Sequence, residues 1–202
     1  DMVIVLDRSG SMKGSKIGDA KRAILNLLSD LSENDRFALV VYSDVVEKYS
    51  DLVHVTDSNR KNLISSIKKI WACGGTNLGA GLKTGVNTLL KTKNIGNTGK
   101  VILISDGLAN RGITDPSSLG NMASIGVEKE FSVTTVGVGT EFNEYLMTFI
   151  ADHGAGSYYY LENPNAFAKV FKKEFYNSKI AAATAVKVKI PLKNGISLVN
   201  AA

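Results

Sequence analysis

The sequence contains a single cysteine, Cys73, among its 202 residues. One thiol excludes an internal disulfide, and it also excludes a zinc site built from several thiolates. Histidine is scarce as well, because His54 and His153 stand alone in the sequence. We therefore expect both histidines to be surface side chains rather than metal ligands or catalytic groups.

Long apolar runs are also missing, since no segment approaches the roughly 20 consecutive apolar residues that span a membrane. The sequence opens on Asp1 and an apolar segment, without the features of a signal peptide. We therefore expect a domain excised from a longer protein, with no direct membrane insertion in this segment.

Charge of one sign is not concentrated anywhere. Lys and Arg exceed Asp and Glu by 24 to 19, for a net charge of +5, but the basic residues are spread thinly and cluster only in short pairs such as Lys68-Lys69 and Lys172-Lys173. Nucleic-acid-binding domains carry a basic patch or stripe, so this pattern favours solvated helix faces and indicates no nucleic-acid partner. The hydrophobic content of 44% suffices for one sizeable core.

Five near-continuous apolar runs are typical of strands that are buried on both faces of a sheet. They comprise residues 2–7, 36–43, 100–106, 131–139 and 157–162. Apolar residues at helical spacing predict helices between and after these runs, around residues 17–31, 63–70, 78–89, 146–150 and 167–175. Asp115-Pro116 and Asn163-Pro164 each place a capping side chain before a proline, which predicts two helix starts.

This alternation of strand and helix predicts an α/β fold with a doubly wound, mostly parallel central sheet and helices on both faces. Residues 46–55 (VEKYSDLVHV), directly after the second strand, predict one short antiparallel edge strand. We expect this domain to occupy residues 1–180.

The C-terminal segment departs from this pattern. Residues 184–202 alternate the outward Lys187 and Lys189 with apolar neighbours and turn at Asn194-Gly195, which predicts a β-hairpin. The extension, residues 181–202, is either an added edge of the main sheet or the start of a second, β-rich domain.

Three polar loops can meet at the carboxyl edge of such a sheet, where ligands bind in open α/β folds. Asp7-Arg8-Ser9-Gly10-Ser11 leaves the first strand, Gly74-Gly75-Thr76-Asn77 opens a helix, and Ser105-Asp106-Gly107 leaves the KVILIS strand. Two converging, dehydrated carboxylates would repel each other unless a cation lay between them. Oxygen-only ligands favour Mg²⁺, Mn²⁺ or Ca²⁺ over zinc, and a small set supplemented by water suits Mg²⁺ best.

The same residues carry a family resemblance. Asp7, Ser9 and Ser11 fit the pattern D-x-S-x-S, Thr76 lies within GGTN, and Asp106 lies within LISDG. In this order and spacing they resemble the metal-ion-dependent adhesion site of the von Willebrand factor A family. The sequence resembles prokaryotic members related to the inter-alpha-trypsin inhibitor heavy chains, and the resemblance covers roughly residues 1–178.

The resemblance implies a Rossmann-like fold and a complete adhesion site. It implies that Ser9, Ser11 and, depending on conformation, Thr76 bind the ion directly, while Asp7 and Asp106 bind it directly or through water. A Glu or Asp side chain of a partner protein would complete the shell. The resemblance therefore predicts a metal-dependent protein-interaction module and favours an extracytoplasmic or membrane-anchored full-length protein.

Two alternatives remain open. In the first, the ion only stabilises the loops of a structural or assembly domain. In the second, aspartate with Mg²⁺ at a strand end serves phosphoryl transfer. The second is disfavoured because haloacid-dehalogenase-type phosphatases have an aspartate where Ser9 stands, and because no G-x-x-x-x-G-K-[ST] loop, G-x-S-x-G elbow or S-x-x-K motif is present around these residues. We therefore expect no enzymatic activity.

Overall fold

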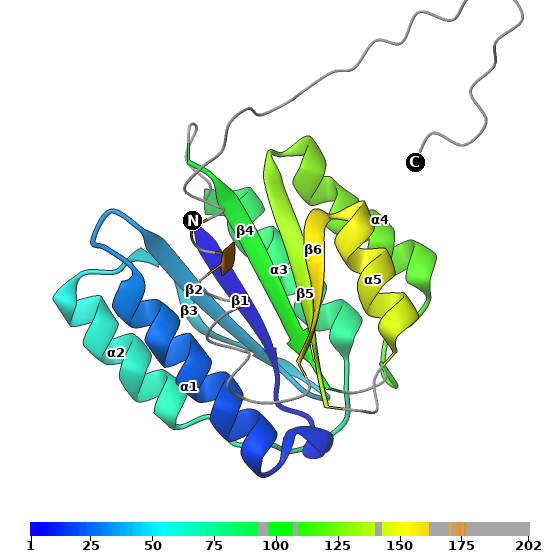
Figure 1. The fold of residues 1–202 in the computed structure, drawn as a ribbon, viewed down its shortest axis with the longest axis horizontal. Helices are drawn as coiled ribbons and strands as arrows, with labels where there is room; N and C mark the ends of the chain where they lie inside the picture. Colours follow the sequence, from blue (N-terminus) through cyan, green and yellow to red (C-terminus); the bar gives the residue numbers. More distant parts are fainter. Residues whose placement is uncertain are drawn as a thin grey trace, which may run out of the picture.

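The computed structural model describes residues 1–92, 97–106, 109–139, 143–161, 170, 173, 174 and 176. A six-stranded sheet lies at the centre, in the order β3-β2-β1-β4-β5-β6 (Figure 1). Its strands are β1 (Met2–Asp7), β2 (Arg36–Tyr42), β3 (Val46–His54), β4 (Gly99–Ser105), β5 (Phe131–Val138) and β6 (Ala155–Leu161). Only β3 pairs antiparallel with its neighbour. The predicted mostly parallel sheet with one antiparallel edge strand is therefore confirmed.

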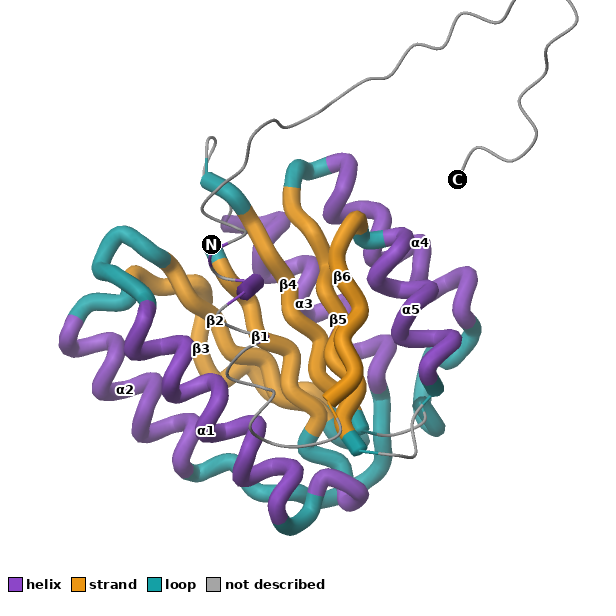
Figure 2. Tube along the Cα trace, in the orientation of Figure 1, coloured by secondary structure: helices purple, strands orange, loops and turns teal. Residues whose placement is uncertain are grey.

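Helices cover both faces of the sheet, as predicted (Figure 2). One face carries α1 (Ser15–Asp30) and α2 (Asp57–Lys68), and the other carries α3 (Leu78–Thr92), α4 (Pro116–Glu128) and α5 (Glu144–His153). The predicted cap at α4 is confirmed, because the Ser118 N–H donates to the Asp115 carboxylate at 2.8 Å. Within the described ranges, no helix is both long and apolar enough to cross a membrane.

Two predictions concern segments that the structure does not cover. The helix start at Asn163-Pro164 and the hairpin of residues 181–202 lie outside the described residues, as does most of the helix predicted around residues 167–175.

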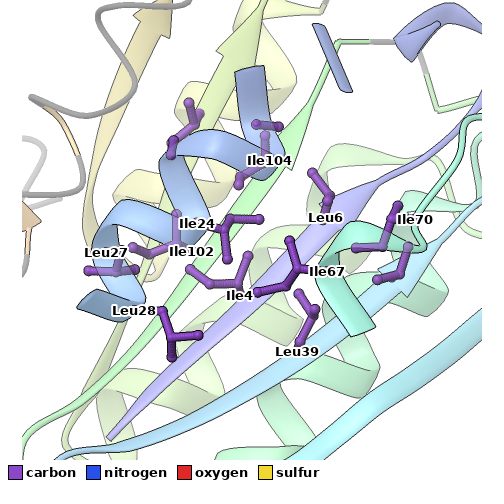
Figure 3. Packing of buried hydrophobic residues seen from close by; sticks show 14 of the residues in the cluster. Ile4, Leu6, Ile24, Leu27, Leu28, Leu39, Ile67, Ile70, Ile102 and Ile104 are labelled. Atoms are coloured by element: carbon purple, nitrogen blue, oxygen red, sulfur yellow. The ribbon is translucent and has the colours of Figure 1, made fainter. Parts of the chain in front are cut away.

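The central strands are buried on both faces, which explains why their sequences are almost continuously apolar. Every residue of β1 and β2 is buried, whereas the edge strand β3 is half-buried or exposed except at Leu52. Side chains from β1 interlock with those of α1 and α2 on one face (Figure 3). The residues labelled there are Ile4, Leu6, Ile24, Leu27, Leu28, Leu39, Ile67, Ile70, Ile102 and Ile104.

A buried acid on the last described segment anchors that segment to the sheet. Glu174 is fully buried and accepts hydrogen bonds from Lys100, from Thr134 at 2.9 Å and from Tyr159 at 2.6 Å. Burial alone would raise the pKa of Glu174, but the bonds from Lys100 and Tyr159 outweigh it and lower the pKa. The carboxylate therefore joins residue 174 to β4, β5 and β6.

Helix α3 packs unusually close to the sheet because it presents glycine to it. A Cβ on Gly81 would lie 2.6 Å from the Tyr42 ring, and a Cβ on Gly85 would overlap the side chain of Val5. These glycines thus allow the close packing that brings the start of α3 near the ends of β1 and β2.

Replacing Gly85 with alanine should therefore destabilise the protein. Overpacking a filled core costs about 1–3 kcal/mol, so we expect the free energy of unfolding to fall by that amount in urea titrations. Gly18→Ala in α1 is the matched control, because a Cβ there would meet no atom within 4 Å. Alanine's helix propensity should raise that variant's stability by about 0.5–1 kcal/mol. Equal stabilities of the two variants would contradict this packing.

Candidate metal-binding site

The candidate site lies where the strand order reverses, between β1 and β4. These two strands are adjacent and parallel, while their successors β2 and β5 lie on opposite sides of them. Asp7 ends β1, and Asp106 directly follows β4 at the same edge, the lower one in Figure 1. Such a reversal leaves the loops free to diverge and is the usual ligand position in open α/β sheets.

Asp7 is fully buried and held by two hydrogen bonds. The Ser9 N–H donates to its Oδ1 at 2.7 Å, and the Ser105 hydroxyl donates to its Oδ2 at 2.6 Å. Burial outweighs these bonds and raises the pKa of Asp7 from 3.8 to about 6, and the nearby charge of Asp106 adds to the increase. The site therefore gives this carboxylate less stabilisation than water would.

Three of the predicted residues form a continuous chain of hydrogen bonds. The hydroxyls of Ser9 and Ser11 lie 3.0 Å apart, and the Ser11 hydroxyl donates to Asp106 Oδ1 at 2.8 Å. Ser9 and Asp106 are buried, whereas Ser11 is exposed. The other oxygen of Asp106 accepts a hydrogen bond from the Lys16 ammonium. The chain therefore links two buried groups through a serine that is open to solvent.

Thr76 lies on a neighbouring loop that is tied to the first one. The Gly10 N–H donates to the Gly74 carbonyl at 2.9 Å, and the Cys73 N–H donates to the Arg8 carbonyl at 2.6 Å. Thr76 itself is buried, and its N–H donates to the Asn110 side chain at 3.0 Å. Within the described residues, its hydroxyl makes no hydrogen bond to the other four predicted ligands.

The five side chains suit a hard divalent cation. They offer two buried carboxylates and three neutral hydroxyls, which is the oxygen chemistry that Mg²⁺, Mn²⁺ and Ca²⁺ prefer. In the described part of the chain, no group of three His, Cys, Asp or Glu side chains could hold an ion. A cation here would thus depend on the hydroxyls of Ser9, Ser11 and Thr76 as well as on the two aspartates.

Three residues of the site are not assigned by the sequence motifs. Ser105 pairs with Asp7 because both face the same side at the ends of adjacent strands, a relation that requires the β1–β4 register. Asn110 braces Thr76 from the third loop, and Lys16 reaches Asp106 from α1. Neither of these two contacts has a signal in the sequence, because the partners lie 34 and 90 positions apart.

Arg8 stands between the predicted ligands but turns away from them. It is 6% exposed, its guanidinium pairs with Glu47, and its Cζ lies 5.9 Å from the centre of the exposed Trp71 ring. Alternate residues of D-x-S-x-S therefore differ in role, as proposed ligands or as a structural contact. Asp7, Ser9 and Ser11 face the site, while Arg8 joins the first loop to β3 and to the segment before Thr76.

Comparison with known proteins identifies the family. The family model of the von Willebrand factor type A domain matches residues 1–173. The chain belongs to this family. The resemblance inferred from the motifs is thereby confirmed, while the completeness of the adhesion site stays a prediction.

Two curated relatives illustrate the breadth of the family. Protein YfbK of Escherichia coli (strain K12) is 31% identical over 192 residues, which are 94% of this chain and 33% of YfbK. Inter-alpha-trypsin inhibitor heavy chain H4 of Homo sapiens is 32% identical over 162 residues, which are 76% of this chain and 17% of the heavy chain. The chain therefore spans a third or less of the length of these relatives.

Solved structures show the same fold. A von Willebrand factor type A protein from Catenulispora acidiphila has a TM-score of 0.78 and 22% identity, covering 88% of this chain and 42% of that one. The pilus adhesin SpaC from Lactobacillus rhamnosus GG has a TM-score of 0.72 and 17% identity, covering 88% of this chain and 30% of that one. Von Willebrand factor type A domains generally mediate protein–protein interaction and adhesion, and they commonly bind a divalent cation.

The raised pKa of Asp7 predicts a pH-dependent stability difference between the wild type and Asp7→Asn in EDTA. The folded protein binds this proton more tightly than the unfolded chain, so its contribution to stability is fully present below pH 3.8 and is lost as the pH rises to about 6. The amide avoids that loss, because it is neutral at every pH.

Asp7→Asn should therefore exceed the wild type in unfolding free energy by up to about 3 kcal/mol above pH 6, and the gap should shrink toward pH 4. Urea unfolding at several pH values measures the difference. A gap that stays constant between pH 4 and pH 7 would show that the Asp7 carboxylate is not destabilised by burial.

Proposed function

We propose that this domain binds a divalent cation, most favourably Mg²⁺, through Asp7, Ser9, Ser11, Thr76 and Asp106, and that it captures an acidic side chain of a partner protein there. The observation that carries the proposal is the pair of fully buried aspartates at the ends of adjacent strands, linked through serine hydroxyls that lead to solvent. Mn²⁺ and Ca²⁺ have the same ligand chemistry and are the other candidate ions.

The need for a cation follows from the electrostatics of the two carboxylates. Burial and the nearby Asp106 both favour the protonated form of Asp7. A divalent cation between them would remove both penalties, because it replaces lost hydration and separates like charges. Ion binding would thereby offset the unfavourable free energy of burying two carboxylates close together.

The neutral ligands make the proposed site suited to an acidic partner. Serine and threonine hydroxyls bind a hard cation without cancelling its charge. Ser11 is exposed, so the site opens to solvent on its side, whereas Asp7, Ser9, Thr76 and Asp106 are buried. When bound, the ion supplies a positive centre with a coordination position that a Glu or Asp side chain of a partner protein can fill. This opening favours partner capture over a purely structural ion.

Binding also accounts for the site better than catalysis does. Both histidines lie at the opposite edge of the sheet, since His54 pairs with Arg36 at the start of β2 and His153 precedes β6. No imidazole can therefore act as a general base for Ser9 or Ser11. The relatives are mostly adhesion or interaction proteins, which agrees with a binding role.

Isothermal titration with Mg²⁺ and Mn²⁺ tests the site. Ser11→Ala should weaken cation binding about tenfold or more, because it removes a proposed ligand. Ser15→Ala is the matched control, since Ser15 is an exposed serine at the start of α1 outside the proposed ligand set. It should bind like the wild type. Equal affinities of the wild type and Ser11→Ala, or no binding by the wild type, would contradict the proposal.

A further inference from the structure

The ammonium group of Lys16 lies in the candidate site. It lies in the first turn of α1, and its ammonium forms an ion pair with Asp106 Oδ2. The Asp106 side chain is fully buried, whereas the Lys16 side chain is 32% exposed. One oxygen of Asp106 thus accepts from Ser11 and the other from Lys16, so both are engaged within the chain.

The position of Lys16 in α1 is unfavourable for a cation. The first turn of a helix carries a partial positive charge and favours acidic side chains over basic ones. The first turn of α1 has no acidic residue, and its N-cap, Gly14, provides no side-chain hydrogen bond. Neither the helix nor the cap therefore stabilises the ammonium, and Asp106 is the acid that does.

A glycine on a third element makes room for the Lys16 side chain. A Cβ on Gly139, which follows β5, would lie 2.9 Å from Lys16 Cε and 3.0 Å from Nζ. Gly139 also has a φ of +83°, which side-chain-bearing residues rarely adopt. The Lys16 side chain thus lies beside Gly139 at the end of β5, and its ammonium reaches Asp106 at the end of β4.

We propose that Lys16 is a built-in counter-ion that competes with the divalent cation for Asp106. This inference rests on the proposed function, because it assigns Asp106 to the cation site. With Lys16 in place, the two carboxylates and the ammonium sum to one negative charge instead of two. A cation therefore meets a weaker attraction, and it takes the place of the ammonium on Asp106. The partial exposure of Lys16 gives the displaced ammonium access to water.

The competition has two consequences for the protein. The buried Asp106 keeps a positive partner when cations are scarce, so the fold does not depend on the ion. Binding also requires a higher cation concentration than the oxygen ligands alone would need. Lys16 thus sets the concentration range over which the site fills.

Lys16→Met tests the competition, because methionine retains an apolar stem of similar length without the charge. Lys13→Met is the matched control, since Lys13 is exposed, lies two residues beyond Ser11, and forms no ion pair with any described residue. Isothermal titration with Mg²⁺ should give about tenfold or tighter binding for Lys16→Met than for the wild type. The control removes the same charge without the contact, so its affinity should change much less.

Thermal unfolding in EDTA gives a second, independent readout. Lys16→Met should unfold several degrees below the wild type and Lys13→Met, because the buried Asp106 loses its partner. Saturating Mg²⁺ should remove this deficit, even if the variant folds only with the ion. Lys16→Gln, measured in parallel, should show the same two shifts.

The possible failures are distinguishable. A wild type that binds Mg²⁺ as tightly as Lys16→Met overturns the competition and leaves the proposed function standing. Equal gains in Lys16→Met and Lys13→Met also overturn it, because they show a general effect of charge. Binding by Lys16→Met alone overturns the proposed function of the wild type and supports the competition. Absence of binding in both overturns both proposals, and an unchanged unfolding temperature in EDTA overturns the role of Lys16 as counter-ion.

Discussion

The site depends on one constraint: two carboxylates, Asp7 and Asp106, are buried at the same edge of the sheet. Asp7 holds its charge less easily here than in water, because burial and the nearby charge of Asp106 raise its pKa to about 6. Neighbouring side chains stabilise the two carboxylates in part. Ser105 and Ser11 donate hydrogen bonds from their hydroxyls, and Lys16 contributes its ammonium. A divalent cation would stabilise both carboxylates more strongly, and this is the physical basis of the proposed function.

The fold supplies the geometry that this chemistry needs. Reversal of the strand order between β1 and β4 leaves the carboxyl ends of two adjacent strands open. Glycines in α3 let that helix approach β1 and β2, so the loop before it carries Thr76 to the same edge. Backbone hydrogen bonds from Gly10 to Gly74 and from Cys73 to Arg8 then hold the first two loops together. The packing of α3 on the sheet thus helps to position the ligands.

Much of this organisation is predictable from the sequence, because burial on both faces and helical periodicity leave direct signatures in it. The six strands and four of the five described helices follow from such patterns, whereas α4 is located only by the cap at Asp115-Pro116. The antiparallel edge follows from the mixed polarity of residues 46–55. Strand order leaves no such signature, so the pairing of Asp7 with Ser105 is not predictable. The contact between Lys16 and Asp106 is not predictable from a motif either, because it forms only when α1 lies beside the end of β4. The assignment of all five ligands rests on the family motif and stays a prediction.

Crystals grown with Mn²⁺ provide the most direct test of the central claim, through the anomalous scattering of that ion. We expect an anomalous peak within bonding distance of the hydroxyl oxygens of Ser9 and Ser11, beside Thr76, Asp7 and Asp106. One coordination position should face solvent or a carboxylate of another molecule. The Lys16 ammonium should then have left Asp106. Full occupancy of Mn²⁺ elsewhere, or an unbroken contact between Lys16 and Asp106 without a peak at saturating Mn²⁺, would contradict the account.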